Sequence, residues 1–229
     1  MEAIILAGGF GTRLQNKLGN IPKPMAPINN RPFLDYLLGY LIKNKVKRVI
    51  FSVYYQYQII KNHYDDCYRN IDILYSIDTE ELGTGGAIKN ALLMVNDNHV
   101  FLINGDTYFN VNLSRLYKEH IANNNDITLS LKPMKNFDRY GIVETDSNAK
   151  VLSLKKKQYH DYGKIDGGIY LIKKNIFSVF KSSNKFSFND FIKNNLKNLK
   201  VGSLLFDELF IDIGIPEDYD RAHLILENY

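Results

Sequence analysis

A glycine-rich segment close to the N-terminus holds the first residues that could do chemistry. It reads Gly8-Gly9-Phe10-Gly11-Thr12-Arg13, it follows an apolar run at residues 3–6, and Lys23 lies shortly beyond it. Glycines allow the backbone to approach phosphate oxygens closely, and their N–H groups can form a cradle for an anion. With the cationic side chains of Arg13 and Lys23 close behind, this segment predicts a phosphate-binding site.

Two common phosphate-binding motifs do not fit this segment. The dinucleotide fingerprint G-x-G-x-x-G would need a glycine at position 14, which is Leu14. A Walker A loop would need Gly-Lys-Ser or Gly-Lys-Thr at its end, and the segment lacks both. A nicotinamide-dependent oxidoreductase is therefore a distant alternative.

Two aspartates follow apolar runs and form a second candidate group. Asp106 comes after the apolar run at residues 100–103, and Asp212 lies within the apolar segment Phe210-Ile211-Asp212-Ile213. Ligands of open α/β sheets bind at the carboxyl ends of the strands. Two carboxylates at one site are a common way to hold Mg²⁺ against phosphates, although each aspartate taken alone fits a capping or turn position better.

The elements that must position these residues follow from the apolar patterns. Short apolar runs predict strands at residues 3–6, 48–53, 71–75 and 100–103, and helical spacing predicts helices at 33–41 and 87–95. This alternation implies βαβ units and a doubly wound sheet. Further strands are expected at 127–131, 141–144, 151–154, 168–172 and 201–206, and helices at 188–196 and 216–227. The second half therefore predicts a mixed-sheet extension that carries a substrate lid.

Composition narrows the classes of protein that fit. The chain has 229 residues, a net charge of +4 and one cysteine, Cys67, which excludes an intramolecular disulfide and a cysteine-based zinc site. The only dense basic run is Lys155-Lys156-Lys157, which does not favour a nucleic-acid partner. The first residues lack a basic region and reach glycine after a few apolar positions, so neither a signal peptide nor a membrane span is expected. We expect a cytoplasmic protein with one domain over residues 1–229.

Several segments together resemble a known family. The glycine-rich segment with Pro22-Lys23-Pro24-Met25 closely resembles the signature of the sugar-1-phosphate nucleotidyltransferases. The resemblance continues, in the family's order, through Leu82-Gly83-Thr84-Gly85-Gly86-Ala87, Asn104-Gly105-Asp106, Tyr140-Gly141-Ile142-Val143, Gly167-Gly168-Ile169-Tyr170 and Ile211-Asp212-Ile213-Gly214-Ile215-Pro216. It implies an α/β fold with a Rossmann-like, doubly wound mixed sheet of the glycosyltransferase-A-like type and a small substrate-binding β extension. It also implies a nucleotide-binding part at about residues 1–110 and a sugar-binding part at about residues 111–229.

The reaction that the resemblance implies is an in-line displacement. A phosphate oxygen of a sugar 1-phosphate attacks the α-phosphorus of a nucleoside triphosphate, and pyrophosphate leaves. Arg13 is then predicted to hold the β- and γ-phosphates, and Lys23 to reach toward the α-phosphate. Asp106 and Asp212 match the family's metal-binding aspartates, so Mg²⁺ is the expected cofactor. These four residues are the predicted catalytic group.

The resemblance also assigns two binding regions. For the nucleotide it implies Leu6, Ala7, Gly8, Gly9, Gly11, Thr12, Arg13, Lys23, Asp78, Gly83, Thr84 and Gly85. For the sugar phosphate it implies Tyr140, Gly141, Lys157, Asp166 and Gly167. Many relatives carry Glu-Glu-Lys-Pro where this chain has Lys155-Lys156-Lys157-Gln158, and many have asparagine at the position of Asp166. A solvated charge run fits Lys155 and Lys156 equally well.

Within the family, residues 22–34, 51–53 and 82–88 look most like those of the D-glycero-α-D-manno-heptose 1-phosphate guanylyltransferases. This implies transfer of GMP from GTP to that heptose 1-phosphate, which yields GDP-heptose and pyrophosphate for capsule, lipopolysaccharide or surface-layer glycans. Guanine requires an acceptor for its N1–H and exocyclic amine, and Asp78 and Glu80 are candidates, although a surface acidic loop fits either residue better. The alternatives are mannose or glucose 1-phosphate with GTP, UTP or dTTP, and a non-catalytic nucleotide-sugar-binding regulatory subunit. The Phe and Tyr content is compatible with a homo-oligomer.

Overall fold

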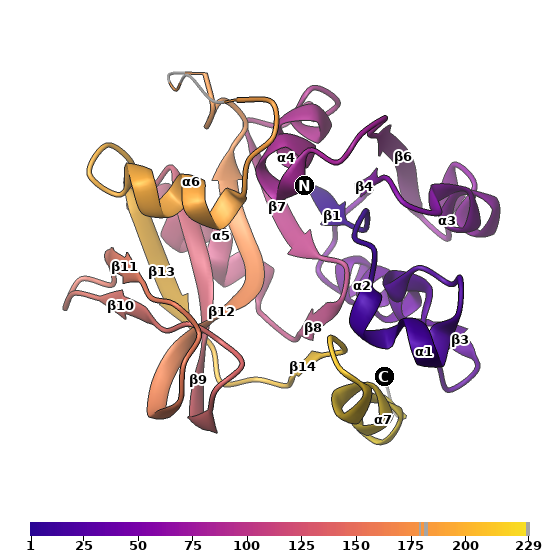
Figure 1. The fold of residues 1–229 in the computed structure, drawn as a ribbon. Helices are drawn as coiled ribbons and strands as arrows, with labels where there is room; N and C mark the ends of the chain where they lie inside the picture. Colours follow the sequence, from indigo (N-terminus) through magenta and orange to yellow (C-terminus); the bar gives the residue numbers. More distant parts are fainter. Residues whose placement is uncertain (179, 181–182, 228–229) are drawn as a thin grey trace.

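One large sheet forms the centre of the molecule (Figure 1). The structure, a computed structural model, describes residues 1–178, 180 and 183–227. The sheet contains eight strands in the order β13-β9-β12-β7-β1-β4-β6-β5. In that order they span Val201–Leu205, Ile127–Phe137, His160–Lys173, His99–Asn104, Glu2–Leu6, Arg48–Val53, Ile71–Ile77 and Cys67–Tyr68.

Strand directions divide the sheet into two parts. Strands β7, β1, β4 and β6 are parallel neighbours, as expected for βαβ units with crossover helices. Strand β12 runs antiparallel to both β7 and β9, and β13 runs parallel to β9. The sheet is therefore mixed and doubly wound, which confirms the fold class predicted from the sequence.

Helices cover both faces of this sheet. Ile5 packs on one face with α2 (Phe33–Lys43), α3 (Tyr57–Tyr64), α5 (Leu113–Ala122) and α7 (Pro216–Ile225). Its neighbour Ile4 packs on the other face with α4 (Gly83–Leu92) and α6 (Phe188–Asn195). Because successive side chains of a strand point to opposite faces, the apolar run of β1 is buried on both sides.

Three small sheets complete the structure near the carboxyl ends of the central strands. They pair β10 (Val143–Thr145) with β11 (Val151–Leu154), β14 (Phe210–Asp212) with β8 (Thr107–Phe109), and β2 (Pro27–Ile28) with β3 (Arg31–Pro32). In the second pair Asp212 lies opposite Thr107, and Ile213 donates its N–H to the carbonyl of Asp106 over 3.0 Å. This pairing brings together two aspartates that are far apart in the sequence.

Short helical turns lie between the first strand and β2. They are η1 (Thr12–Leu14), α1 (Gln15–Leu18) and η2 (Lys23–Met25). Lys17 of α1 forms an ion pair of 2.6 Å with Asp220 of α7, which joins the two ends of the chain. Across the described residues, no helix combines the length and apolar character that crossing a bilayer requires.

Several elements differ from those predicted. A strand is expected only at 168–172, but β12 begins at His160. Its glycines at 163, 167 and 168 hide the strand in the sequence pattern, although they do not end it in the structure. Its pairing with β9 shifts in register between Asp166 and Tyr170, as in a β-bulge. The helices α3 and α5 are not predicted from the sequence, and the strand expected at 141–144 begins at Val143.

Candidate active site

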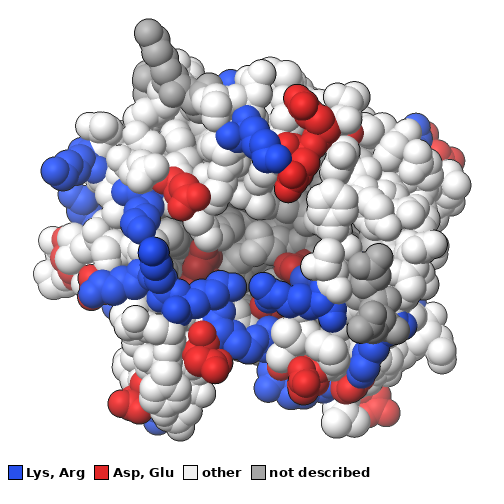
Figure 2. Space-filling model, viewed as in Figure 1, with Lys and Arg blue, Asp and Glu red and all other residues white. Residues whose placement is uncertain are grey.

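A large cleft opens at the carboxyl ends of β1, β6 and β7. Its volume is about 950 Å³, and its walls come from both halves of the chain. Figure 2 shows Lys and Arg side chains gathered along the lower rim of the hollow. The basic residues that line the cleft are Arg13, Lys23, Lys155, Lys156, Lys157 and Lys193. Such an arrangement concentrates positive potential where an anionic ligand would enter.

The glycine-rich segment forms one wall of the cleft. A Cβ atom on Gly8 would lie 3.1 Å from the backbone nitrogen of Tyr54, and one on Gly11 would lie 3.1 Å from Cβ of Lys23. Gly11 also has a φ of +62°, which favours glycine. The turn therefore leaves its backbone close to the cleft, where Thr12 and Arg13 are exposed lining residues.

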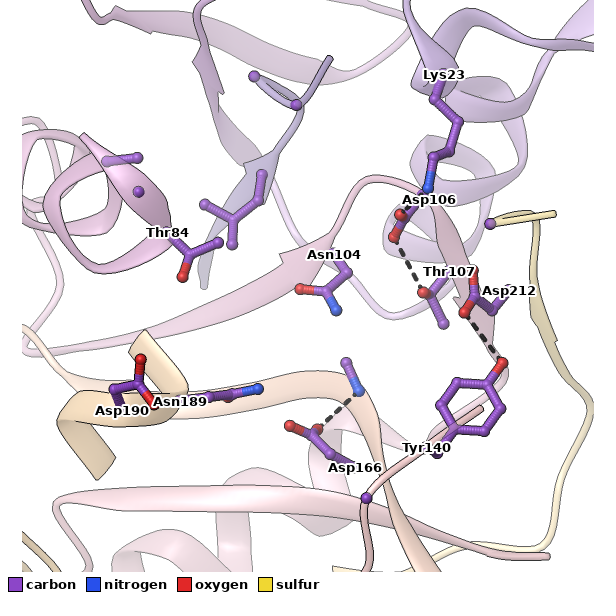
Figure 3. Close-up of a pocket in the computed structure, with 18 of the residues that line it drawn as sticks. Lys23, Thr84, Asn104, Asp106, Thr107, Tyr140, Asp166, Asn189, Asp190 and Asp212 are labelled. Carbon is purple, nitrogen blue, oxygen red and sulfur yellow. Dashed lines mark hydrogen bonds and ion pairs between the residues drawn. The ribbon is translucent and has the colours of Figure 1, made fainter. Parts of the chain in front are cut away.

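An ion pair lies at the centre of the cleft. The Nζ atom of Lys23 is 2.5 Å from Oδ2 of Asp106, and Thr107 donates its hydroxyl to Oδ1 of Asp106 over 3.2 Å (Figure 3). Lys23 follows Pro22 in the turn η2, and Asp106 comes two residues after the end of β7. The lysine thus neutralises a carboxylate that would otherwise point unpaired into the cleft.

Asp212 is the second carboxylate at this centre. Its Oδ2 accepts the hydroxyl of Tyr140 over 3.0 Å (Figure 3). The same oxygen lies 3.8 Å from a guanidinium nitrogen of Arg139, which also pairs with Asp218. Burial and the negative charge of Asp106 raise the pKa of Asp212, while Lys23, Tyr140 and Arg139 act in the opposite direction. A nearby cation stabilises the charged form of a carboxylate with these surroundings.

The donor set at this centre fits a hard divalent cation. Asp106 and Asp212 supply carboxylate oxygens, and the negative charge of Asp106 raises the cost of charging Asp212. Within the described ranges, no group of three or more His, Cys, Asp or Glu side chains converges on a common point. Two carboxylates leave most coordination positions open, which is typical of Mg²⁺ bound together with phosphates and water.

The N-terminal turn of α4, with its N-cap Leu82, is held against the segment before α6. Gly85 donates its N–H to the carbonyl of Phe186 over 2.9 Å, and Phe186 donates its N–H to the carbonyl of Leu82 over 3.0 Å. Thr84 accepts the N–H of Phe188 over 2.9 Å. A Cβ atom on Gly85 would lie 2.2 Å from the Phe186 ring, so this close contact requires glycine.

Asp78 lies at the same end of the cleft, directly after β6. Its side chain is 8% exposed, and Oδ1 accepts Nδ2 of Asn90 over 2.9 Å. Burial raises the pKa of Asp78, and the hydrogen bond from Asn90 acts in the opposite direction. Glu80 also lines the cleft but is exposed. Its side chain forms no hydrogen bond or ion pair with another described residue.

The opposite end of the cleft contains Tyr140, Gly141 and the triple-lysine run. A Cβ atom on Gly141 would lie 1.9 Å from the carbonyl oxygen of Lys155, so the two segments pack backbone to backbone. Lys155 forms an ion pair of 2.6 Å with Glu144, on the neighbouring strand β10. Lys157 lines the cleft, as does Lys156.

Asp166 lies in the floor of the cleft and has its own partners within the fold. Its Oδ2 accepts the hydroxyl of Tyr170 over 2.5 Å, and its Oδ1 accepts the N–H of Gly168 over 3.0 Å. Burial raises the pKa of Asp166, while both hydrogen bonds oppose that shift. These bonds fix the bulge of β12 that contains Gly167, a further lining residue.

The structure thus brings nearly all predicted site residues to one cleft. The exceptions are Ala7 and Gly85, which do not line it: Ala7 is 1% exposed, and Gly85 lies beneath Phe186. Sequence reasoning missed Asn104 and the residues of α6 that face the cleft, among them Asn189 and Asp190 (Figure 3). Asn104 precedes Gly105-Asp106, so that motif pointed to it, whereas no pattern singled out the first turn of α6.

Comparison with known proteins supplies the family. Residues 2–228 match the family model described as Nucleotidyl transferase. The chain is 48% identical over 228 residues to the D-glycero-alpha-D-manno-heptose 1-phosphate guanylyltransferase of Campylobacter jejuni, with 100% of both chains covered. It is 46% identical over 230 residues to the protein of that name from Aneurinibacillus thermoaerophilus, again with 100% of both chains covered.

A solved structure matches over almost the whole chain. The crystal structure of HddC from Yersinia pseudotuberculosis complexed with GMP-PN has a TM-score of 0.86 and 35% identity, and the match covers 98% of this chain and 99% of that one. The family match, the full-length relatives and this structure agree with the resemblance seen in the sequence motifs. The chain belongs to the nucleotidyl transferase family.

Proposed function

We propose that this protein transfers GMP from GTP to D-glycero-α-D-manno-heptose 1-phosphate and releases GDP-heptose and pyrophosphate. The observation that carries the proposal is the cleft, which joins a glycine-rich wall with Arg13 and Lys23 to the carboxylates Asp106 and Asp212. Two relatives at 48% and 46% identity, both named as guanylyltransferases for this heptose 1-phosphate, support the choice of substrates.

The reaction exchanges one phosphoanhydride bond for another. A phosphate oxygen of the sugar 1-phosphate attacks the α-phosphorus of GTP, and the bond from the α-phosphorus to the bridging oxygen of the β-phosphate breaks. The electron pair of that bond leaves with pyrophosphate. No covalent nucleophile from the protein is needed, so alignment and charge stabilisation supply the rate.

Two cations of the chain act on the triphosphate. Lys23 moves from its pair with Asp106 toward the α-phosphate, where negative charge accumulates during attack. Arg13, exposed on the cleft wall, holds the β- and γ-phosphates and stabilises the departing pyrophosphate. The N–H groups of the glycine-rich segment add neutral donors to the same oxygens.

Asp106 and Asp212 hold Mg²⁺ in this proposal. When bound, the ion neutralises phosphate charge and helps to align the α-phosphate with the attacking oxygen. Tyr140 and Arg139 orient the carboxylate of Asp212, since both contact its Oδ2. With Mg²⁺ held there, Asp106 would no longer need Lys23 as its counter-charge, and the ammonium group of Lys23 would be free to contact a phosphate.

The sugar 1-phosphate occupies the end of the cleft formed by Tyr140, Gly141 and Gly167. Lys157 contacts its phosphate group, and Asp166 shapes the floor under the sugar ring through its bonds to Tyr170 and Gly168. A cytoplasmic location, a homo-oligomeric state and a role of the product in surface glycans remain predictions from the sequence.

The test is pyrophosphate release with Mg²⁺ across a grid of nucleoside triphosphates and sugar 1-phosphates. The proposal predicts turnover with GTP and the manno-heptose 1-phosphate, and little with mannose or glucose 1-phosphate or with UTP and dTTP. Turnover confined to another pair of nucleoside triphosphate and sugar 1-phosphate would support the same type of reaction with that pair as its substrates. Absence of turnover with every pair, while nucleotide still binds, would favour a regulatory subunit that binds nucleotide sugars.

A further inference from the structure

Asp78 is a nearly buried carboxylate at the wall of the cleft. It is 8% exposed, yet among the described residues its side chain pairs with no Lys, Arg or His, and its one hydrogen-bond partner is Asn90. Its Oδ2 has no partner within the described chain, and the residue lines the cleft. A nearly buried carboxylate in such a position is stabilised by donors from a ligand.

Guanine offers donors that match this carboxylate. Its N1–H and exocyclic amine point the same way from adjacent positions, so one carboxylate can accept both in a bidentate pair. Adenine places an acceptor at N1, and uracil and thymine place carbonyl oxygens on both sides of a single N–H. Hypoxanthine keeps the N1–H of guanine and lacks the amine.

A bidentate pair requires the carboxylate plane to be fixed. The aspartate χ2 torsion is soft, and rotation about it would bring only one oxygen toward the base. Asn90, on α4, fixes this torsion by donating Nδ2 to Oδ1 at 2.9 Å. The backbone on both sides is also fixed, because Asp78 donates its N–H to the carbonyl of Val53 over 2.9 Å and α4 packs against the sheet.

We propose that Asn90 is a positioning residue that orients the carboxylate of Asp78 and thereby sets the preference for guanine over hypoxanthine. The inference rests on the proposed function, because it takes GTP as the nucleotide of this cleft. Asn90 does not line the cleft itself, so it acts through Asp78. Its hydrogen bond also favours the ionised carboxylate against the effect of burial.

Asn90→Leu tests this role, because leucine has a similar size and no donor. Initial rates are measured with GTP and with ITP at a saturating concentration of the heptose 1-phosphate. The variant should lower kcat/KM for GTP about tenfold through KM, while kcat/KM for ITP changes less than about twofold. A single hydrogen bond to hypoxanthine tolerates rotation of the carboxylate, which is why the two nucleotides respond differently.

Two further variants complete the experiment. Asn195→Leu is the matched control, since Asn195 donates Nδ2 to the carbonyl of Phe191 over 2.8 Å at the end of α6 and lies outside the cleft. It should leave the GTP-to-ITP ratio unchanged. Asp78→Asn, which replaces an acceptor oxygen by an amide donor, should abolish the preference for GTP. If Asn90→Leu aggregates, Asn90→Ala takes its place, with the same expected split.

The outcomes separate this inference from the proposed function. If the wild type turns over GTP but Asn90→Leu lowers the rates with GTP and ITP equally, the positioning role is wrong and the function stands. If the wild type does not turn over GTP, the function fails, and calorimetric binding of GTP and ITP to the wild type and Asn90→Leu decides the inference alone. A smaller difference in affinity between GTP and ITP for Asn90→Leu than for the wild type then supports the positioning role of Asn90. An unchanged difference overturns that role.

Discussion

The Nζ atom of Lys23 lies 2.5 Å from Oδ2 of Asp106, at the point where the glycine-rich wall meets the carboxylate pair. A lysine in this position neutralises the site before substrates arrive and can turn to a phosphate when they bind. The charge on the lysine also opposes the rise in the pKa of Asp212 that Asp106 and burial cause. Lys23, which neutralises Asp106 in this structure, is thus also the residue that is proposed to act on the α-phosphate.

Asp106→Asn and Asp212→Asn should each lower kcat at least about a hundredfold, the order expected when a charge-stabilising group is lost. Steady-state rates at saturating GTP and sugar 1-phosphate measure the effect, with thermal unfolding to verify that each variant is folded. Asp207→Asn is a suitable control, because Asp207 is 81% exposed in its side chain and lies outside the cleft. Near-normal turnover in either variant would remove the metal assignment.

Lys157→Ala should raise the KM for the sugar 1-phosphate at least tenfold while the KM for GTP changes less than about twofold. The reason is the loss of one cation from the phosphate-binding end of the cleft. Lys155→Ala serves as the comparison, since the Lys155 ammonium pairs with Glu144 and both groups are about half exposed. Equal changes in both KM values for Lys157→Ala would identify the triple-lysine run as solvated surface.

Gly85→Ala should raise the KM for GTP about tenfold or more and lower thermal stability. Its Cβ would lie 2.2 Å from the Phe186 ring, which forces the N-terminal turn of α4 and the segment before α6 apart. The double variant Gly85→Ala/Phe186→Leu should recover part of both losses, because the shorter side chain makes room. Gly39→Ala is the control, since its Cβ would meet nothing within 4 Å. A double variant no better than the single one would contradict the packing argument.

The stability of the fold should fall between about pH 6.5 and pH 4. Burial and the neighbouring His99 lower the pKa of His120 to about 4, whereas the unfolded chain titrates near 6.5. In that interval the unfolded state binds more protons, so the free energy of unfolding decreases as the pH falls, by on the order of 3 kcal/mol in total. Urea unfolding of the wild type and His120→Asn across this range is the measurement. A wild-type slope no steeper than that of the variant would contradict the prediction.

The parallel part of the fold could be predicted because its signals are local. Strand β1 is an apolar run buried on both faces, and a glycine ends it. Helix α5 was missed because its apolar positions Leu113 and Leu116 are followed by His120, a polar residue buried by contacts with His99 and Thr128. The local spacing of apolar residues cannot show that a histidine on a helix is buried by partners on strands elsewhere in the chain.

The residues of the candidate site also differ in how far the sequence alone reveals them. Asp106 and Asp212 were recognisable, because each follows or lies within an apolar run and belongs to a motif of the family. Asn90 carried no signal, since its role depends on a contact with Asp78 across a loop and a helix turn. The packing of Phe186 on Gly85 joins residues about a hundred positions apart, so only the folded chain reveals it.

In the proposed reaction the α-phosphate of GTP moves, with its nucleoside, to the sugar 1-phosphate. This transfer is measured in parallel reactions with [α-³²P]GTP and [γ-³²P]GTP, each with and without the manno-heptose 1-phosphate, by chromatography of the products. The α-label should enter a nucleotide sugar only when the sugar phosphate is present, and the γ-label should leave in pyrophosphate. Release of the γ-label as orthophosphate, or no transfer of the α-label by protein that still binds GTP, would rule out this reaction.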